Sequence, residues 1–192
     1  RVMYCISDFF YLIIYYIVGY RRNVVRKNLT TAFPDKDEKE IVSIEKGYYH
    51  WLCDYFVEAL KLLSVSDKTL LKHIEFRNVE ELEQHYDKGQ TCAAILGHYC
   101  NWELLSAIGL AFKRHKDAVC GLIYHPLRSD IFDELFKDIR QSKGGVCIPK
   151  RDILRYLVTY KREKRMWLFG YISDQSPKWS NIHLWLPFLN HD

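Results

Sequence analysis

The feature that most constrains the fold is an alternation, after Gly89, of short apolar runs with longer amphipathic segments. The apolar runs have the length of buried strands, and the segments between them repeat with helical spacing. The expected strands are 91–97, 118–124, 146–149 and 165–173, and the expected helices are 102–114, 129–143 and 151–164. Strands that alternate with helices of this length form βαβ units, in which the strands lie parallel. The sequence therefore predicts an α/β fold with a largely parallel sheet flanked by helices.

Polar side chains follow each of the four expected strands. In open α/β sheets the functional crevice lies beyond the carboxyl ends of the strands, so parallel strands would bring these side chains to one edge. The residues that leave the strands there are His98, then Tyr124 and His125, then Lys150 and Arg151, and finally Asp174 and Gln175. This edge is the candidate site.

His98 and Glu103 form the most informative pair, in the stretch GHYCNWE. On a regular helix, residues five apart point about 140° away from each other, so two such side chains would not meet within a helix. They can meet if His98 lies in a strand-to-helix turn and Glu103 lies in the first helical turn. A carboxylate on one imidazole nitrogen fixes the tautomer and leaves the other nitrogen as a base. The alternative is a polar residue at a strand end beside an exposed first-turn acid.

The first twenty residues are almost continuously apolar and aromatic, and a cluster of cations follows over 21–27. The unbroken part, 9–18, is about half of the ~20 residues that a spanning helix needs, and a signal-peptide cleavage site is missing. The tyrosines and the adjoining cations favour a membrane-docking helix over residues 1–20, facing anionic lipid. A core helix of a soluble protein is the alternative. Residues 21–192 would then form the α/β domain.

Charge and cysteine usage exclude several classes of protein. A net charge of +4 is mild, and no zinc-finger or RNP-type motif is present, so we expect no nucleic-acid partner. The six cysteines show no CxxC or metal-ligand spacing, which indicates a reducing compartment, no disulfides and no metal. Cys100 lies too close to His98 along the turn to pair with it as a nucleophile. No GxSxG motif supports an esterase of the α/β-hydrolase type.

Two further segments carry expectations. Residues 150–165 hold seven Lys or Arg against two acids. They form either a solvated helix face or a docking patch for an acidic carrier protein or anionic lipid. The alternating apolar residues of 179–189 predict a last strand that borders an acyl groove.

The stretch GHYCNWE resembles the HxxxxD/E motif of the lysophospholipid acyltransferase superfamily. Three longer segments resemble the bacterial lipid A secondary (lauroyl/myristoyl) acyltransferases, so that the resemblance covers nearly the whole chain. They are GYRRNVVRKNLTTAFPDKDEKE, GLIYHPLRSDIFDELFKDIRQSKGG and ISDQSPKWSNIHLWLPFLN. Family members run longer than this chain, so the resemblance implies a domain that is incomplete at its C-terminus.

The resemblance implies a glycerolipid acyltransferase-like fold and transfer of a fatty acyl group from acyl carrier protein to a hydroxyl of a lipid A precursor. The reaction would take place at the cytoplasmic face of the bacterial inner membrane. The acyl carrier protein thioester would be the donor substrate, and no metal or other cofactor would be required. Direct attack needs no enzyme nucleophile, which would leave Cys100 dispensable.

Residue by residue, the resemblance makes His98 the general base and Glu103 its orienting partner. Asp174 would be the acid of the third segment, and Arg140 a cation for the phosphosugar headgroup. Apart from the resemblance, the residue types at Lys178 and Trp179 lead us to expect contact with lipid or headgroup. The second segment usually reads Tyr-Arg-Pro, whereas this chain has His125 in the middle position, so a donor often assigned to substrate binding is replaced here.

Two alternative functions stay open at this point. The chain could be an acyltransferase of the same superfamily that acts on another lipid acceptor, or a non-catalytic membrane-binding protein. The second alternative predicts that joint substitution of His98, Glu103 and Asp174 is tolerated.

Overall fold

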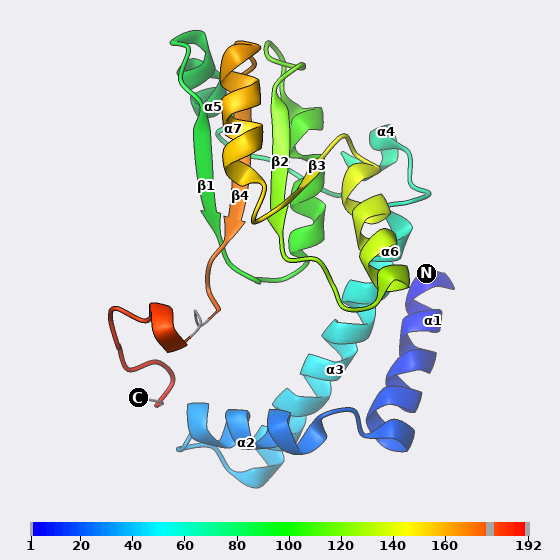
Figure 1. Ribbon diagram of the computed structural model, residues 1–192. Coiled ribbons are helices and arrows are strands. Elements are labelled where there is room, and N and C mark those ends of the chain that lie inside the picture. Colours follow the sequence, from blue (N-terminus) through cyan, green and yellow to red (C-terminus); the bar gives the residue numbers. More distant parts are fainter. Residues whose placement is uncertain (1, 176–178, 191–192) are drawn as a thin grey trace. The chain divides into compact units, whose positions relative to one another are not determined.

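The computed structural model describes residues 2–175 and 179–190 (Figure 1). The chain divides into two compact units. One unit is drawn from the chain before residue 59 and after residue 175, and the other is Ala59–Gln175. The expected boundary at residue 20 concerns membrane association, which this division does not test.

The second unit is built on a four-stranded parallel sheet (Figure 1). Its strands are β1 (Cys92–Leu96), β2 (Val119–Tyr124), β3 (Val146–Pro149) and β4 (Trp167–Ile172). The order across the sheet is β1-β4-β2-β3, and every neighbouring pair is parallel. The predicted α/β fold with a parallel sheet is therefore confirmed, and each strand lies within its expected range to about two residues.

Helices cover both faces of this sheet. They are α5 (Val79–Asp87), the 3₁₀ helix η2 (Trp102–Ala111), α6 (Asp130–Gln141) and α7 (Ile153–Arg162), whereas the short helix α4 (Asp67–Leu70) packs through Leu70 with Ala107 of η2 and Ile139 of α6. Successive strand residues point to opposite faces, and the core divides accordingly. Val119 and Phe169 pack with Tyr160 of α7, whereas Cys120 and Leu168 pack with residues of α5 and η2.

The helix expected over 102–114 has 3₁₀ geometry and ends at Ala111. Within it, the Ser106 hydroxyl donates to the Glu103 carbonyl oxygen at 2.7 Å. Serine side chains that bond to a nearby carbonyl compete with the regular helical ladder, which is consistent with the tighter winding of this segment.

The first unit contains α1 (Val2–Tyr11), the π-helix η1 (Leu12–Val18), α2 (Arg22–Ala32) and most of α3 (Glu38–Lys61). Its core is rich in tyrosine and comprises Tyr11, Tyr15, Tyr49 and Cys53. The buried Glu45 carboxylate accepts from the Tyr15 hydroxyl at 2.9 Å and from the Arg26 guanidinium at 3.1 Å. The expected single helix over 1–20 is thus an α-helix that continues as a π-helix and ends at Gly19, where φ is +61°.

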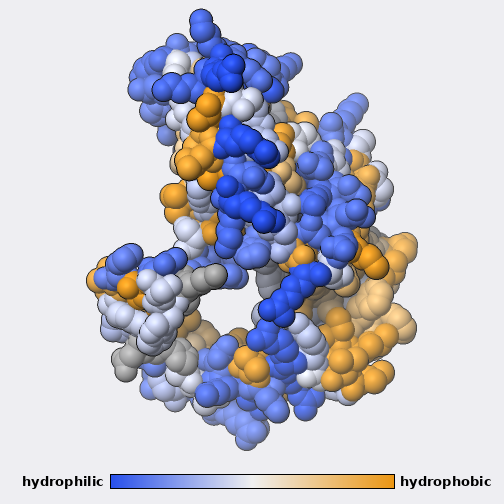
Figure 2. Space-filling view, viewed as in Figure 1, coloured by the Kyte–Doolittle hydropathy of each residue, from blue (hydrophilic) through white to orange (hydrophobic). Residues whose placement is uncertain are grey.

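Many apolar side chains of α1 and η1 are exposed (Figure 2). They are Val2, Tyr4, Ile6, Phe9, Phe10, Leu12, Tyr16, Ile17 and Val18. Among the described residues, no single helix has the length and hydropathy to cross a bilayer. Val2–Val18 and Arg22–Ala32 meet that criterion only as a pair, and they are bent by 95°. Docking of this segment on a membrane remains a prediction.

The prediction of a last strand over 179–189 is wrong. Residues 179–181 form a short 3₁₀ helix, η3 (Trp179–Asn181), and the chain beyond it is irregular apart from an isolated bridge at Phe188. Leu184, Trp185 and Leu186 are all exposed. Three successive apolar residues ahead of Pro187 do not alternate between two faces, and proline cannot donate to a strand ladder.

Candidate active site

The carboxyl edge of the sheet brings His98 and Asp174 together. Leu96 and Ile172 form the last pair between β1 and β4, and the Ser173 backbone N–H donates to the Leu96 carbonyl oxygen at 3.0 Å. Directly beyond this pair, His98 Nδ1 lies 2.6 Å from Asp174 Oδ1, and the His98 backbone N–H donates to Asp174 Oδ2 at 2.7 Å. One carboxylate therefore holds both the backbone and the ring of His98.

This contact sets the chemistry of the imidazole. An ionised carboxylate only accepts hydrogen bonds, so Nδ1 carries the proton and Nε2 keeps its lone pair. The hydrogen bonds from the His98 backbone and ring hold the pKa of Asp174 below its ordinary value. The His98 side chain is 32% exposed, so a reactant from solution can approach it. An imidazole held in this way can accept a proton at Nε2.

Three residues close to His98 in the sequence favour this geometry of the turn. A side chain at Gly97 would place its Cβ 3.3 Å from Asp174 Oδ2, so glycine leaves the carboxylate room to approach. Cys100, between β1 and η2, has a φ of +49°, which lies in the left-handed region. The Trp102 ring lies edge-on to the imidazole, with centroids 4.8 Å apart.

Glu103 lies in the first turn of η2, as predicted, but its side chain is buried and makes a paired contact with Arg140 of α6. Arg140 donates from Nε to Oε2 at 2.8 Å and from its terminal nitrogen to Oε1 at 2.7 Å. The alternative reading of Glu103 as an exposed first-turn acid is therefore wrong. The contact with His98 Nδ1 that the sequence analysis assigns to Glu103 is made by Asp174. A headgroup-binding role for Arg140 remains a prediction.

The other predicted site residues of the second unit lie at the same edge of the sheet. Tyr124 ends β2, and its carbonyl oxygen accepts from the Lys150 backbone N–H at 3.0 Å, which joins the ends of β2 and β3. His125 is exposed, and its Nδ1 lies 2.9 Å from the Pro126 carbonyl oxygen. Lys150 and Arg151 are exposed after β3. Gln175 adjoins Asp174, and Lys178 lies outside the described residues.

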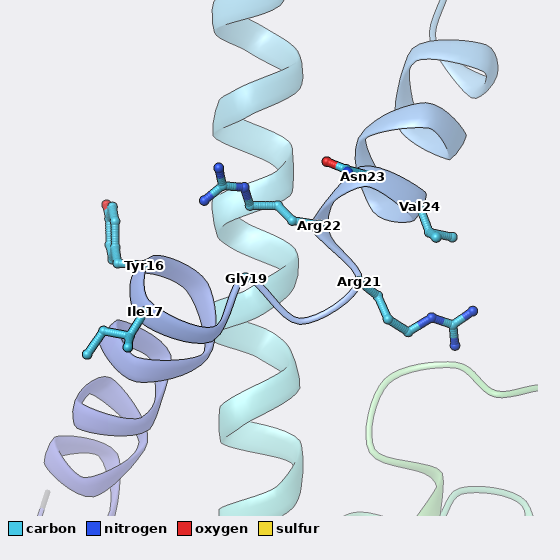
Figure 3. Close-up of a pocket in the computed structure, with 7 residues that line it drawn as sticks. All are labelled: Tyr16, Ile17, Gly19, Arg21, Arg22, Asn23 and Val24. Carbon is cyan, nitrogen blue, oxygen red and sulfur yellow. The ribbon is translucent and has the colours of Figure 1, made fainter.

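Two other kinds of site find less support. Among residues 2–175 and 179–190, no three His, Cys, Asp or Glu side chains are grouped as a metal site requires. In the first unit, a cavity of about 470 Å³ lies where η1 gives way to α2 (Figure 3). The side chains of Arg21 and Arg22 point away from each other there, and Arg22 donates to the Tyr15 carbonyl oxygen at 3.3 Å. Converging polar groups are found at the sheet edge instead.

The site predicted from the sequence includes Asp174 but does not pair it with His98, and it does not include Trp102. Part of the signal for the His98–Asp174 pair is present in the sequence, since both residues are expected at one edge of the sheet. What was missing was the position of β4 beside β1. Trp102 carries no signal beyond its place inside the GHYCNWE stretch.

Comparison with known proteins identifies the family of the chain. A search of curated proteins found no match to the chain. The family model for bacterial lipid A biosynthesis acyltransferase matches residues 2–182, which includes both β1 and β4 with the residues that follow them. The chain therefore belongs to the bacterial lipid A biosynthesis acyltransferase family, as the resemblance of its motifs predicted.

Proposed function

We propose that this chain transfers a fatty acyl group from acyl carrier protein to a hydroxyl of a lipid A precursor, with His98 as the general base. The observation that carries the proposal is the bridging of the His98 ring and backbone by the Asp174 carboxylate at the carboxyl edge of the sheet. Membership of the family supports the acyl-transfer chemistry and the lipid A acceptor.

The residue types fit direct transfer between the two substrates. Nε2 of His98 takes the proton of the acceptor hydroxyl while the hydroxyl oxygen attacks the thioester carbonyl carbon. A base of this kind contributes about 10²–10⁴-fold to the rate. The carbon–sulfur bond then breaks, and the departing carrier thiolate takes the proton back from the imidazolium. The products are an ester and a free thiol, so neither an enzyme nucleophile nor a cofactor is needed.

Asp174 and Glu103 would have separate parts in this reaction. Asp174 orients His98 and stabilises the imidazolium that forms after proton abstraction. Glu103, through its paired contact with Arg140, holds the start of η2 against α6, and backbone N–H groups at the start of η2 are candidate donors to the oxyanion. Glu103 therefore supports the turn that carries His98.

Substrate binding is assigned to the remaining residues of the edge. The exposed cations Lys150 and Arg151 suit the phosphates of a lipid A precursor, with Tyr124, His125 and Gln175 beside them. Lys178 is assigned from the sequence alone. The exposed apolar side chains of α1 and η1 would place the protein at the cytoplasmic face of the bacterial inner membrane, where both substrates are available.

The test is transfer of a radiolabelled acyl chain from acyl carrier protein to a lipid A precursor by His98→Ala. We expect at least a hundredfold loss of kcat, with an unchanged circular dichroism spectrum and melting temperature. His85→Ala, an exposed histidine of α5, is the matched control and should keep full activity. Full activity of His98→Ala would end the mechanism.

The acceptor needs a separate measurement, because the same base could serve another lipid. Mass spectrometry of lipids from a strain that lacks the gene should show lipid A short of one acyl chain. Unchanged lipid A together with loss of an acyl chain from a different lipid would assign the alternative acceptor.

A further inference from the structure

The positive charge of this chain is concentrated in one short segment. Residues 150–165 contain seven of the 28 Lys and Arg residues and two of the 24 acids. The rest of the chain therefore holds 21 cations and 22 acids, close to neutral. The net charge of +4 is thus a property of α7 and its two ends.

α7 is amphipathic in an unusual way, because its outward side is also partly apolar. Its inward residues Tyr156 and Tyr160 pack on the sheet with Phe169. On the outward side, Leu154 is 72% exposed and Val158 is 59% exposed, one helical turn apart. The exposed cations Arg155, Lys161 and Arg162 flank this pair. We call these five residues the α7 outer face, and Figure 2 shows apolar side chains beside strongly hydrophilic ones in this region.

We propose that the α7 outer face is the docking surface for an acidic carrier protein that presents the acyl thioester. This inference rests on the proposed function and names the place where its donor binds. A protein with an acidic helix would set its carboxylates against Arg155, Lys161 and Arg162 and a few apolar side chains against Leu154 and Val158. Complementary charge of this kind steers encounter and fixes orientation.

The position of α7 agrees with delivery to His98. α7 begins at Ile153, four residues after β3 ends at Pro149, so its first turn lies near the carboxyl edge of the sheet (Figure 1). The helix has ten residues and is therefore about 15 Å long. A carrier seated on it would lie beside the edge that holds the imidazole.

An anionic membrane surface is the competing partner, and the apolar content argues against it. Leu154 and Val158 make a strip of two side chains, whereas α1 and η1 expose nine large apolar side chains. Stable insertion at an interface scales with the buried apolar area. The strip on α7 suits a partner the width of one helix.

The test compares two donors in Arg155→Glu/Arg162→Glu. One donor is the acylated bacterial acyl carrier protein, and the other is the neutral thioester acyl-N-acetylcysteamine, which has no charged surface to dock. Lys72→Glu/Lys88→Glu is the matched control, because both lysines are exposed in the second unit and the change in charge is the same. Leu154→Ser tests the apolar strip without changing charge. Circular dichroism and thermal melting confirm that each variant is folded.

We expect KM for acylated carrier protein to rise about tenfold or more in the double Arg variant, with kcat and the rate with the neutral thioester unchanged. The effect should shrink as salt is raised, because exposed charges are screened over about 10 Å at 0.1 M salt. Equal KM values in the Arg variant and the Lys control would overturn the docking surface. Loss of binding to vesicles containing anionic phospholipid, with KM for the carrier unchanged, would assign the face to the membrane instead.

Failure of the acyl-transfer proposal can be distinguished from failure of the docking surface by measuring carrier binding directly. Calorimetric titration of the wild type and the variants with purified carrier protein reports docking without catalysis. If no donor supports transfer but the carrier still binds, and binding is lost in Arg155→Glu/Arg162→Glu, then the surface stands and the acyl-transfer proposal falls. If the wild type does not bind the carrier, the docking surface is refuted.

Discussion

Replacing Asp174 by asparagine is the sharpest test of the His98 site, because the change keeps the shape of the side chain. The carboxylate accepts two hydrogen bonds, from His98 Nδ1 at 2.6 Å and from the His98 backbone N–H at 2.7 Å. An amide has one acceptor oxygen, so asparagine can satisfy both positions in one way only. Its oxygen must accept from the backbone, and its NH₂ must donate to Nδ1.

That arrangement moves the imidazole proton to Nε2 and removes the base. The opposite amide orientation keeps the working tautomer but places NH₂ against a backbone N–H, which costs about 1–3 kcal/mol for the unsatisfied group. At about 1.4 kcal/mol per factor of ten, the working tautomer is depleted about 5- to 150-fold. Loss of the negative charge beside the imidazolium adds to this, and we expect kcat to fall about 10²–10⁴-fold.

The assay is steady-state acyl transfer with acylated carrier protein and a lipid A precursor over a range of pH. Asp138→Asn, at an exposed position of α6, is the matched control and should behave as wild type. KM should change little, because Asp174 touches His98 rather than substrate in this mechanism. A variant that keeps more than a third of the wild-type kcat, while Glu103→Gln is inactive but folded, would refute the assignment and restore the His98–Glu103 pair.

Arg140→Met should lower the free energy of unfolding, measured in urea, by about 3–5 kcal/mol, because it leaves the buried Glu103 carboxylate without its bidentate donor. Adding Glu103→Leu should recover most of this loss. A double variant that is no more stable than Arg140→Met would contradict this prediction. Cys100→Gly should keep full transfer activity, since glycine adopts a φ of +49° without strain. Cys100→Val should unfold at a lower temperature than the wild type. An inactive glycine variant would point to a chemical role for the thiol. The Asp174 carboxyl has a lowered pKa in the folded state, so its contribution to stability is complete above its ordinary pKa of about 3.9 and is lost as pH falls through the lower folded pKa. Carbon-13 NMR titration of the carboxyl should give a pKa below about 3.9. An ordinary pKa would contradict the two hydrogen bonds.

The strands and their parallel arrangement could be predicted from the sequence because each strand is a short apolar run with clear ends. The run 91–97 became β1 at Cys92–Leu96, and 165–173 became β4 at Trp167–Ile172. Burial on both faces of a parallel sheet requires such continuous apolar runs. The edge at which polar residues gather follows from the same argument.

The pairing within the site could not be predicted, because strand order leaves no periodic trace in a sequence. The close sequence spacing of His98 and Glu103 suggested a local pair. The real partner, Asp174, is 76 residues away and becomes a neighbour only because β4 lies beside β1. The buried contact between Glu103 and Arg140 joins η2 to α6 across 37 residues, which spacing along one helix does not reveal.

The place of β4 in the sheet also determines when the contact between His98 and Asp174 can form during folding. β4 follows β1, β2 and β3 in the chain, yet it lies between β1 and β2 in the sheet, so that β1 and β2 are joined through β4. Pairings between distant parts of a chain form slowly, since a long loop must close first. His98 therefore meets the Asp174 carboxylate only after β4 has inserted beside β1, and a partly folded chain carries the imidazole without this hydrogen-bond partner.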